Sequence, residues 1–293
     1  MSRNSLQSIS NGNRLSSGWR LLFGILLFTF FILTLIPLLN VLAVSFSERA
    51  ESMEPGIKLL PTTPAIEGYS TIWNRISLDR AFFNSLFVSS VSVVLQVLLS
   101  SLAAYVLIQR DLPGRRLLTS IILLTLMIPG DLTLISTYLL NRQLNLLNSY
   151  TGLIVNGLIS GFAIMLLRNY FQQVPESLAE SARIDGATEL RLFFGVYLPL
   201  SIPGLASIGF LEFVGKWNAL MIPVSIISRQ ELYTLPMLLK LVTFSTESTS
   251  GIDFIAPNAQ MAAVVITVLP LIALYFLVQN YLIEGLTFGA AKG

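Results

Sequence analysis

A polar segment between two apolar ones holds the residues of this chain whose types and spacing point to a functional role. It reads Glu180-Ser181-Ala182-Arg183-Ile184-Asp185-Gly186, and after nine more residues it continues Val196-Tyr197-Leu198-Pro199. A glycine in such a place commonly ends a helix in a left-handed conformation. The spacing therefore predicts a short helix, a break at Gly186 and a second helix. That arrangement suits either mechanical contact with a partner protein or an amphipathic elbow on a membrane surface.

The residues around this segment support both helices. Pro175 fits the first turn of the first helix, where its missing N–H is not needed, and Thr188 suits the N-cap of the second. Small side chains give the first helix a narrow face that would let a partner approach its backbone: Leu178, Ala179 and Ala182. Apolar side chains give the second helix a face that could lie along the membrane: Leu190, Phe193, Phe194 and Tyr197.

The composition indicates a membrane protein and excludes most catalytic sites. Of the 293 residues, 54% are hydrophobic and only 12% are charged, whereas soluble domains carry about 25% charged residues. The chain has no cysteine and no histidine, which excludes disulfides, thiolate ligands and the commonest general base. The net charge of +2 is too small to indicate nucleic-acid binding. We therefore expect no enzymatic activity, no metal and no cofactor.

Six segments are apolar and long enough to cross a bilayer, which requires about 20 residues. They predict an all-α integral membrane protein with six transmembrane helices, at about 20–45, 82–108, 117–140, 150–168, 204–227 and 259–283. The fourth is the weakest, because polar and small residues dilute it. We expect residues 1–18 to be a mobile cytoplasmic tail and residues 19–293 to be one membrane domain, with the polar loop at 169–203.

Basic residues predict the orientation, because Lys and Arg accumulate on the cytoplasmic side of a membrane. The first twenty residues hold Arg3, Arg14 and Arg20 without an acidic residue. The connection at 110–116 is short and strongly basic, although it also contains Asp111. Both belong in the cytoplasm, and an even number of spans returns the C-terminus to the same side. The polar segment then also faces the cytoplasm, where ATP is.

The polar segment closely resembles the E-A-A loop of ATP-binding-cassette (ABC) importer permeases, which reads E-A-A, three residues, G, nine residues, I, one residue, L-P. The stretch E-S-A-R-I-D-G-A from residue 180, with L-P-L-S-I-P ending at residue 203, is similar to the carbohydrate-uptake branch. Further similarities are Pro129-Gly130-Asp131, Trp217-Asn218, Asn258 with Met261, and the ending Gly285-Leu-Thr-Phe-Gly-Ala-Ala-Lys-Gly293. The resemblance covers nearly the whole chain after Leu21 and is closest to the smaller six-span membrane subunit of the maltose-type importer.

The resemblance implies a bacterial-type plasma (inner) membrane and a defined assembly. A homologous second permease subunit would complete a heterodimer in the lipid, two copies of a cytoplasmic ABC ATPase would dock on the loop, and an extracytoplasmic solute-binding protein would deliver the solute. The residues that would couple to the ATPase are Glu180, Ser181, Ala182, Ile184, Asp185, Gly186, Leu198 and Pro199. The chain has no phosphate-binding G-x-x-x-x-G-K-[ST] loop of its own. Two positions depart from the branch: Ser181 replaces an alanine, and Ala219 stands where an acidic residue is frequent.

Polar and aromatic residues inside the expected spans are candidates for a translocation path or gate, because charges in a bilayer are costly. Glu212 and Lys216 are four residues apart on one helix and are expected to pair, either at a subunit interface or beside the path. Trp217 and Asn218 offer the stacking surface and the amide that a sugar needs, but such residues also serve as packing groups. Asp131 follows a Pro-Gly break, where it is either a gate hinge or a local partner for freed backbone groups.

The sequence thus favours a permease subunit of an ATP-driven importer for a sugar or a sugar-like solute. One alternative is a self-contained secondary transporter or channel, although such proteins usually show internal repeats or several intramembrane acids and histidines. Another is an ABC permease for a different solute, such as an amino acid or phosphate. A membrane-embedded enzyme is disfavoured because the sequence offers no acid–base or metal constellation.

Overall fold

The structure is a computed structural model that describes residues 17–248 and 254–290. Within these residues the regular structure is helical, and the only β pairing is an isolated bridge between Ser47 and Pro64. The chain divides into two compact units, one of residues 1–71 with 256–265 and one of residues 72–255 with 266–293. Nearly all of the expected N-terminal tail lies outside the described residues.

The first unit contains the long helix α2 (Ser17–Ser45), the loop after it and the first turns of α16 (Pro257–Ala290). α2 has 29 residues, so it is about 43 Å long and exceeds the hydrocarbon thickness of a bilayer. Most of its residues are apolar, as the first expected span requires, with Arg20 in its first turns.

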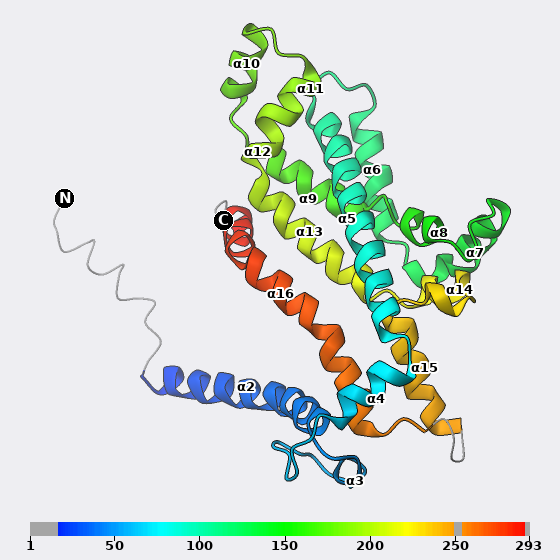
Figure 1. The fold of residues 1–293 in the computed structure, drawn as a ribbon. Helices are drawn as coiled ribbons and strands as arrows, with labels where there is room; N and C mark the ends of the chain where they lie inside the picture. Colours follow the sequence, from blue (N-terminus) through cyan, green and yellow to red (C-terminus); the bar gives the residue numbers. More distant parts are fainter. Residues whose placement is uncertain (1–16, 249–253, 291–293) are drawn as a thin grey trace. The chain divides into compact units, whose positions relative to one another are not determined.

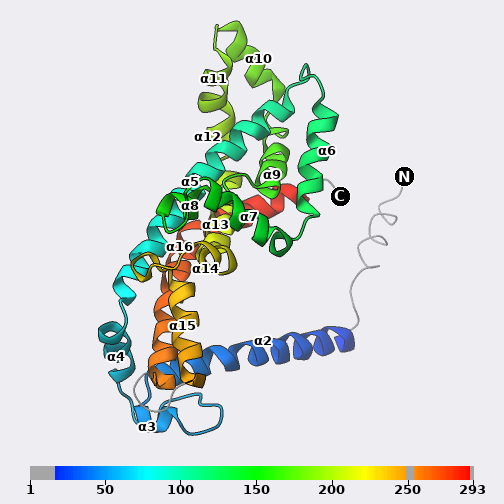
Figure 2. The ribbon, with the colours of Figure 1, turned by 90° about the vertical axis from the view of Figure 1, so that its right-hand side faces the viewer.

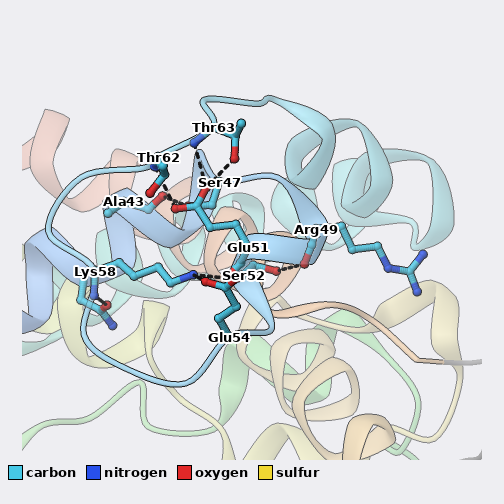
Figure 3. Close-up of polar contacts among 10 residues, drawn as sticks. Ala43, Ser47, Arg49, Glu51, Ser52, Glu54, Lys58, Thr62 and Thr63 are labelled. Carbon is cyan, nitrogen blue, oxygen red and sulfur yellow. Dashed lines mark hydrogen bonds and ion pairs between the residues drawn. The ribbon is translucent and has the colours of Figure 1, made fainter.

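One carboxylate holds the loop after α2 closed (Figure 3). Glu51, in the short helix α3 (Arg49–Ser52), accepts hydrogen bonds from the backbone amides of Thr62 and Thr63 at 2.8 and 2.9 Å. The Thr63 hydroxyl donates to the same carboxylate at 2.9 Å. The loop between α3 and Thr63 is therefore held closed by hydrogen bonds to one of its own carboxylates.

These hydrogen bonds give the loop a defined pH dependence. They favour the ionised form of Glu51 and lower its pKa from 4.5 to about 2, chiefly through the amides of Thr62 and Thr63. A carboxyl with a lowered pKa stabilises the fold above its unfolded pKa, and that contribution is lost as the pH falls through the folded pKa. We expect the loop amides to stay protected from neutral pH to about pH 4.5 and to lose protection as the pH approaches about 2.

Amide hydrogen exchange, corrected for the intrinsic pH dependence of exchange, checks this expectation. Glu51→Gln keeps the shape of the side chain but removes its charge, so its loop amides should exchange faster already at neutral pH. Equal protection of the wild-type loop and the Glu51→Gln loop at neutral pH would show that the carboxylate does not hold the loop.

Asn258 joins the first turn of α16 to this loop. Its side-chain amide donates to the Ser47 carbonyl oxygen at 3.2 Å, and its Oδ1 accepts from the Ala259 amide at 2.8 Å. Gly68, near the start of α4 (Glu67–Arg75), lies so close that an added Cβ would be 2.8 Å from the Asn258 carbonyl carbon. Asn258 is buried, and its amide therefore serves internal packing between α16 and the loop after α2.

The second unit is built around α5 (Leu78–Ile108), which packs chiefly against α9 (Gly161–Phe171) and α13 (Ile202–Trp217). Its other helices are α6 (Arg115–Leu126), α7 (Leu134–Gln143), α8 (Tyr150–Val155), α10 (Glu176–Ile184), α11 (Glu189–Leu192), α12 (Leu198–Leu200), α14 (Met221–Ile226) and α15 (Leu235–Ser248), together with the end of α4 and the part of α16 from residue 266. Figures 1 and 2 show α10, α11 and α12 gathered at one end of α5, with α7, α8 and α14 beside its middle. The polar loop and the apolar bundle thus form one folded unit.

Three of the expected spans are single helices and three are broken. Among the described residues, α2, α5 and α16 are each long and apolar enough to cross a membrane, and the bent pair ending in α13 makes a fourth candidate. The third expected span is divided into α6 and α7 by the 3-10 turn η1 (Gly130–Thr133), directly after Pro129. The fourth is divided into α8 and α9, and the fifth into α13 and α14.

Candidate functional site

The polar loop folds into an elbow, residues 175–201, whose first helix ends as the sequence predicts. α10 begins after Pro175, which takes the N-cap position. At its end, Gly186 adopts a left-handed φ of +80°, its amide donates to the Arg183 carbonyl at 3.0 Å, and the Ala187 amide donates to the Ala182 carbonyl at 2.9 Å. This pair of bonds is a Schellman motif, which satisfies carbonyl groups that a helix end leaves open.

The second half of the elbow turns the chain sharply into α13. Thr188 caps α11, with its hydroxyl accepting from the Arg191 amide at 3.4 Å. A π-helical turn, η2 (Phe193–Tyr197), and the short α12 follow, and the axis then bends by 79° at Ser201. The Ser201 amide donates to the Tyr197 carbonyl at 3.1 Å, so hydrogen bonding continues through the bend.

The apolar face expected along the second helix is split between two environments. Phe193 and Tyr197 are buried, and their rings lie 5.4 and 5.0 Å from that of Tyr105 on α5. Leu190 and Phe194 are exposed. The π-helical turn changes the residue spacing, which places side chains on a different face from the one that an α-helical period predicts. The prediction of one continuous membrane-facing stripe was therefore wrong for Phe193 and Tyr197.

Two ion pairs and one tyrosine hydroxyl tie the elbow together and to the end of α5. Arg110, just beyond α5, pairs with Glu176 at 2.6 Å, and Arg183 pairs with Glu189 at 3.2 Å. The Tyr105 hydroxyl donates to the other carboxylate oxygen of Glu189. A hollow of about 880 Å³ opens between the connection after α5 and the elbow, and the four charged side chains of these ion pairs line it. The two halves of the elbow are therefore braced against each other and against a span.

Sequence reasoning missed this bracing network. Arg183 and Glu189 are six residues apart, but the two contacts that reach Arg110 and Tyr105 join residues 66 and 84 apart, so no local spacing rule relates those partners. The only signal in the sequence was that charge patterning placed Arg110 and the elbow on the same side of the membrane.

Removing the Tyr105 hydroxyl should loosen the elbow without unpacking it. We expect Tyr105→Phe to lower the free energy of unfolding by about 1 kcal/mol, because one hydrogen bond to a partly exposed carboxylate is lost while the ring stays packed. Thermal unfolding in detergent measures the change. Tyr197→Phe is the matched control, because the Tyr197 hydroxyl forms no hydrogen bond within the described residues. An equal loss of stability in both variants would contradict a specific role for the Tyr105–Glu189 bond.

The residues expected to couple to a partner differ in how they are placed. Glu180, Ser181, Asp185 and Pro199 are exposed, and Ile184 is 86% exposed although it is a large apolar residue. Ala182 and Leu198 are half-buried against the core that contains Tyr105 and Phe171. Ala179 is buried as well. Of the expected narrow face, Ala179 and Ala182 therefore pack against the chain itself, whereas Leu178 is exposed. The face of α10 open to a partner carries Ser181 and Ile184 as well.

The candidate path residues are mostly used for packing. Lys216 does not pair with Glu212: among the described residues Glu212 has no ion pair, and the Lys216 ammonium donates to the carbonyl oxygens of Asn156 and Gly157 at 2.8 and 3.0 Å. The expectation of a Glu212–Lys216 ion pair was wrong, because the carbonyl oxygens at the break of the fourth span hold the ammonium instead.

Trp217 is 1% exposed, and its indole N–H donates to the Thr267 carbonyl of α16 at 3.1 Å. It stacks on Phe213, so it offers no surface to a solute in this conformation. Asn218 caps the end of α13 and donates to the Val214 carbonyl at 2.9 Å. Asp131 lies in η1, and its side chain is outside the described part of the chain.

A comparison with known families explains the elbow. Residues 96–287, which include α9 to α13 and the whole elbow, match the family described as "Binding-protein-dependent transport system inner membrane component". That match spans more than half of the chain. The chain belongs to this family. The permease is therefore one membrane component of a multi-subunit transport system.

Individual relatives extend the similarity to almost the full length of the permease. The arabinooligosaccharide transport permease AraQ of Halalkalibacterium halodurans is 33% identical over 94% of this chain and 96% of its own. The trehalose transport permease SugB of Mycobacterium tuberculosis is 30% identical over 88% of this chain and 93% of its own. A chain in the crystal structure of a bacterial ABC transporter that imports the acidic polysaccharide alginate has a TM-score of 0.80 at 26% identity. It covers 92% of this chain and 99% of the solved one.

Proposed function

We propose that this chain is a permease subunit of an ATP-driven importer for a sugar or an oligosaccharide, moved by a separate ATPase that docks on the elbow. The observation that carries the proposal is the geometry of α10. It is a short, capped helix at one end of the bundle, braced to α5 and presenting an exposed Ile184 beside a left-handed Gly186. An exposed large apolar residue on an otherwise polar surface is typical of a protein-binding site.

The chain lacks parts that an ATP-driven pump needs, and these missing parts indicate its partners. It lacks a phosphate-binding loop, so ATP hydrolysis must occur on another chain, two copies of which would serve a two-subunit permease. The second permease would be a homologue of this one, and an extracytoplasmic binding protein would supply the solute. An alginate importer has been solved in complex with a pentasaccharide-bound periplasmic protein, and its 16% identical chain shares the fold of this one.

The proposed setting is a bacterial-type inner membrane surrounded by lipid, with the elbow and both termini in the cytoplasm. Arg110 and Arg183 support this orientation, since basic residues near span ends accumulate on the cytoplasmic side. Membership of the binding-protein-dependent family argues against a self-contained secondary transporter or channel.

Uptake by the reconstituted system tests the proposal. The permease would be purified with its co-purifying subunits, placed in liposomes with ATP inside, and given its binding protein with neutral disaccharides, neutral oligosaccharides or acidic oligosaccharides outside. We expect ATP-dependent accumulation of one of these classes. Uptake of amino acids or phosphate, with no sugar accumulated, would overturn the sugar assignment. Uptake without ATP and without other subunits would overturn the proposed pump.

A further inference from the structure

The fourth span is interrupted at a point where its backbone needs partners. α8 ends at Val155, Gly157 takes a left-handed φ of +76°, and α9 starts only after Ser160, whose hydroxyl caps it. Carbonyl oxygens at such a break lose their helical partners. In a bilayer this loss is costly unless other groups of the protein replace them.

Lys216 supplies those partners from a different helix. Its ammonium donates to the carbonyl oxygens of Asn156 and Gly157, which follow the last turn of α8. A cation is favoured at this end of a helix by the helix dipole. The break is fixed on its other side as well, because the Asn156 and Asn141 side-chain amides exchange two hydrogen bonds of 3.1 Å.

The fit around the ammonium is tight on the Gly157 side. A Cβ at Gly157 would lie 2.6 Å from the Lys216 Nζ atom. Glycine at this position therefore allows both the left-handed turn and the close approach of the ammonium.

Lys216 also occupies an informative place on α13. It is next to the last residue of that helix, whose first residue directly follows the bend at Ser201. The rise of an α-helix puts about 21 Å between Ile202 and Lys216. Hydrogen bonds run through the bend, from Ser201 back to Tyr197 and from Leu205 to Ser201. Hydrogen bonding is therefore continuous from the elbow into α13, the helix that carries Lys216.

We propose that Lys216 is a positioning residue that locks the far end of α13 to the break in the fourth span. Movement of the elbow then moves the segment 156–160 together with α13. This role rests on the proposed function, because it requires an ATPase to move the elbow. It replaces substrate contact as the role of Lys216.

The test compares ATP hydrolysis with transport in the reconstituted complex. Lys216→Met keeps the length and apolar stem of the side chain but removes the donors. We expect transport to fall by about tenfold, because hydrogen bonds from a charged donor are among the stronger ones in a protein and the lock would lose both, while ATP hydrolysis stays within about twofold of wild type. Ile159→Cys, at an exposed position in the break of this cysteine-free chain, reports the motion. Its labelling by a thiol reagent should depend on nucleotide in wild type and lose that dependence with Lys216→Met.

Three further variants separate the lock from other effects. Lys216→Arg retains donors for both carbonyls and should restore most transport. Gly157→Ala should impair transport more than Gly114→Ala, because Gly114 has a similar φ of +71° but no neighbour near its Cβ.

The outcomes distinguish this role from the proposed function. Normal transport and normal nucleotide-dependent labelling with Lys216→Met would overturn the lock and leave the importer intact. If Lys216→Met does not assemble, the comparison of Gly157→Ala with Gly114→Ala decides. Equal transport by these two variants would overturn the lock. A wild-type complex without an ATPase would overturn the proposed function and the lock together.

Discussion

Gly186→Arg is expected to leave the permease folded and inserted while reducing ATP-driven transport by about thirtyfold or more. Gly186 has φ +80°, and a Cβ added there would have no atom of its own chain within 4 Å. The folded subunit should therefore lose only about 1–2 kcal/mol for the left-handed conformation. The large side chain would instead occupy the turn beside Ile184 that a partner must approach, and losing a central docking contact commonly costs about 2 kcal/mol or more in binding.

Gly186→Asn is the matched control, since asparagine tolerates the left-handed region and adds much less bulk. The ATPase content of the purified complex and the rate of uptake are measured for both variants. The complex with Gly186→Arg is expected to lose the ATPase, and the complex with Gly186→Asn is expected to keep most of it. Normal transport by Gly186→Arg would mean that the turn is not a docking element.

Ile184→Glu is the second substitution with a large expected effect. Ile184 is 86% exposed, so few contacts inside the chain are lost and the stability of the subunit should change by about 0.5 kcal/mol or less. In a docked complex the same position would be covered, and an unpaired charge buried there costs about 3 kcal/mol, or about a hundredfold in affinity. We therefore expect the permease to purify without its ATPase.

Ile184→Met keeps an apolar side chain of similar size and should retain the ATPase. Leu190→Glu makes the same change at another exposed apolar position of the elbow, 67% exposed on α11, and shows whether the effect belongs to α10. ATPase retained in equal amount by Ile184→Glu and Ile184→Met would place the docking surface elsewhere.

The elbow was predictable wherever its conformation depends on local residue types. Gly186 and Thr188 adopt the left-handed turn and the helix cap that their chemistry favours. The break at Pro129 was predictable because proline followed directly by glycine disfavours a helix, although single prolines, Pro37 and Pro270, are tolerated inside α2 and α16. The long apolar helices α2, α5 and α16 follow from their composition alone.

The tertiary partners of the charged residues were not predictable from spacing. Lys216 and Glu212 lie four residues apart, which favours a pair on an isolated helix by only a few tenths of a kcal/mol. The carbonyl oxygens of Asn156 and Gly157 offer the ammonium two hydrogen bonds, and nothing in the sequence near Lys216 indicates their position. The π-helical turn at 193–197 likewise depends on packing of Phe193 and Tyr197 against α5 rather than on a sequence period.

Site-specific crosslinking from α10 tests most directly whether a separate ATPase docks on the elbow. The chain has no cysteine, so Ser181→Cys creates a unique attachment point on the exposed face of α10, and Ile57→Cys, 71% exposed in the loop after α2, is the control. A short thiol-linked photocrosslinker is attached in native membranes, and the crosslinked chains are identified by mass spectrometry. We predict that position 181 captures a protein with a phosphate-binding G-x-x-x-x-G-K-[ST] loop and that position 57 does not. Capture of no such ATPase from position 181, by a permease that still transports, would contradict the account.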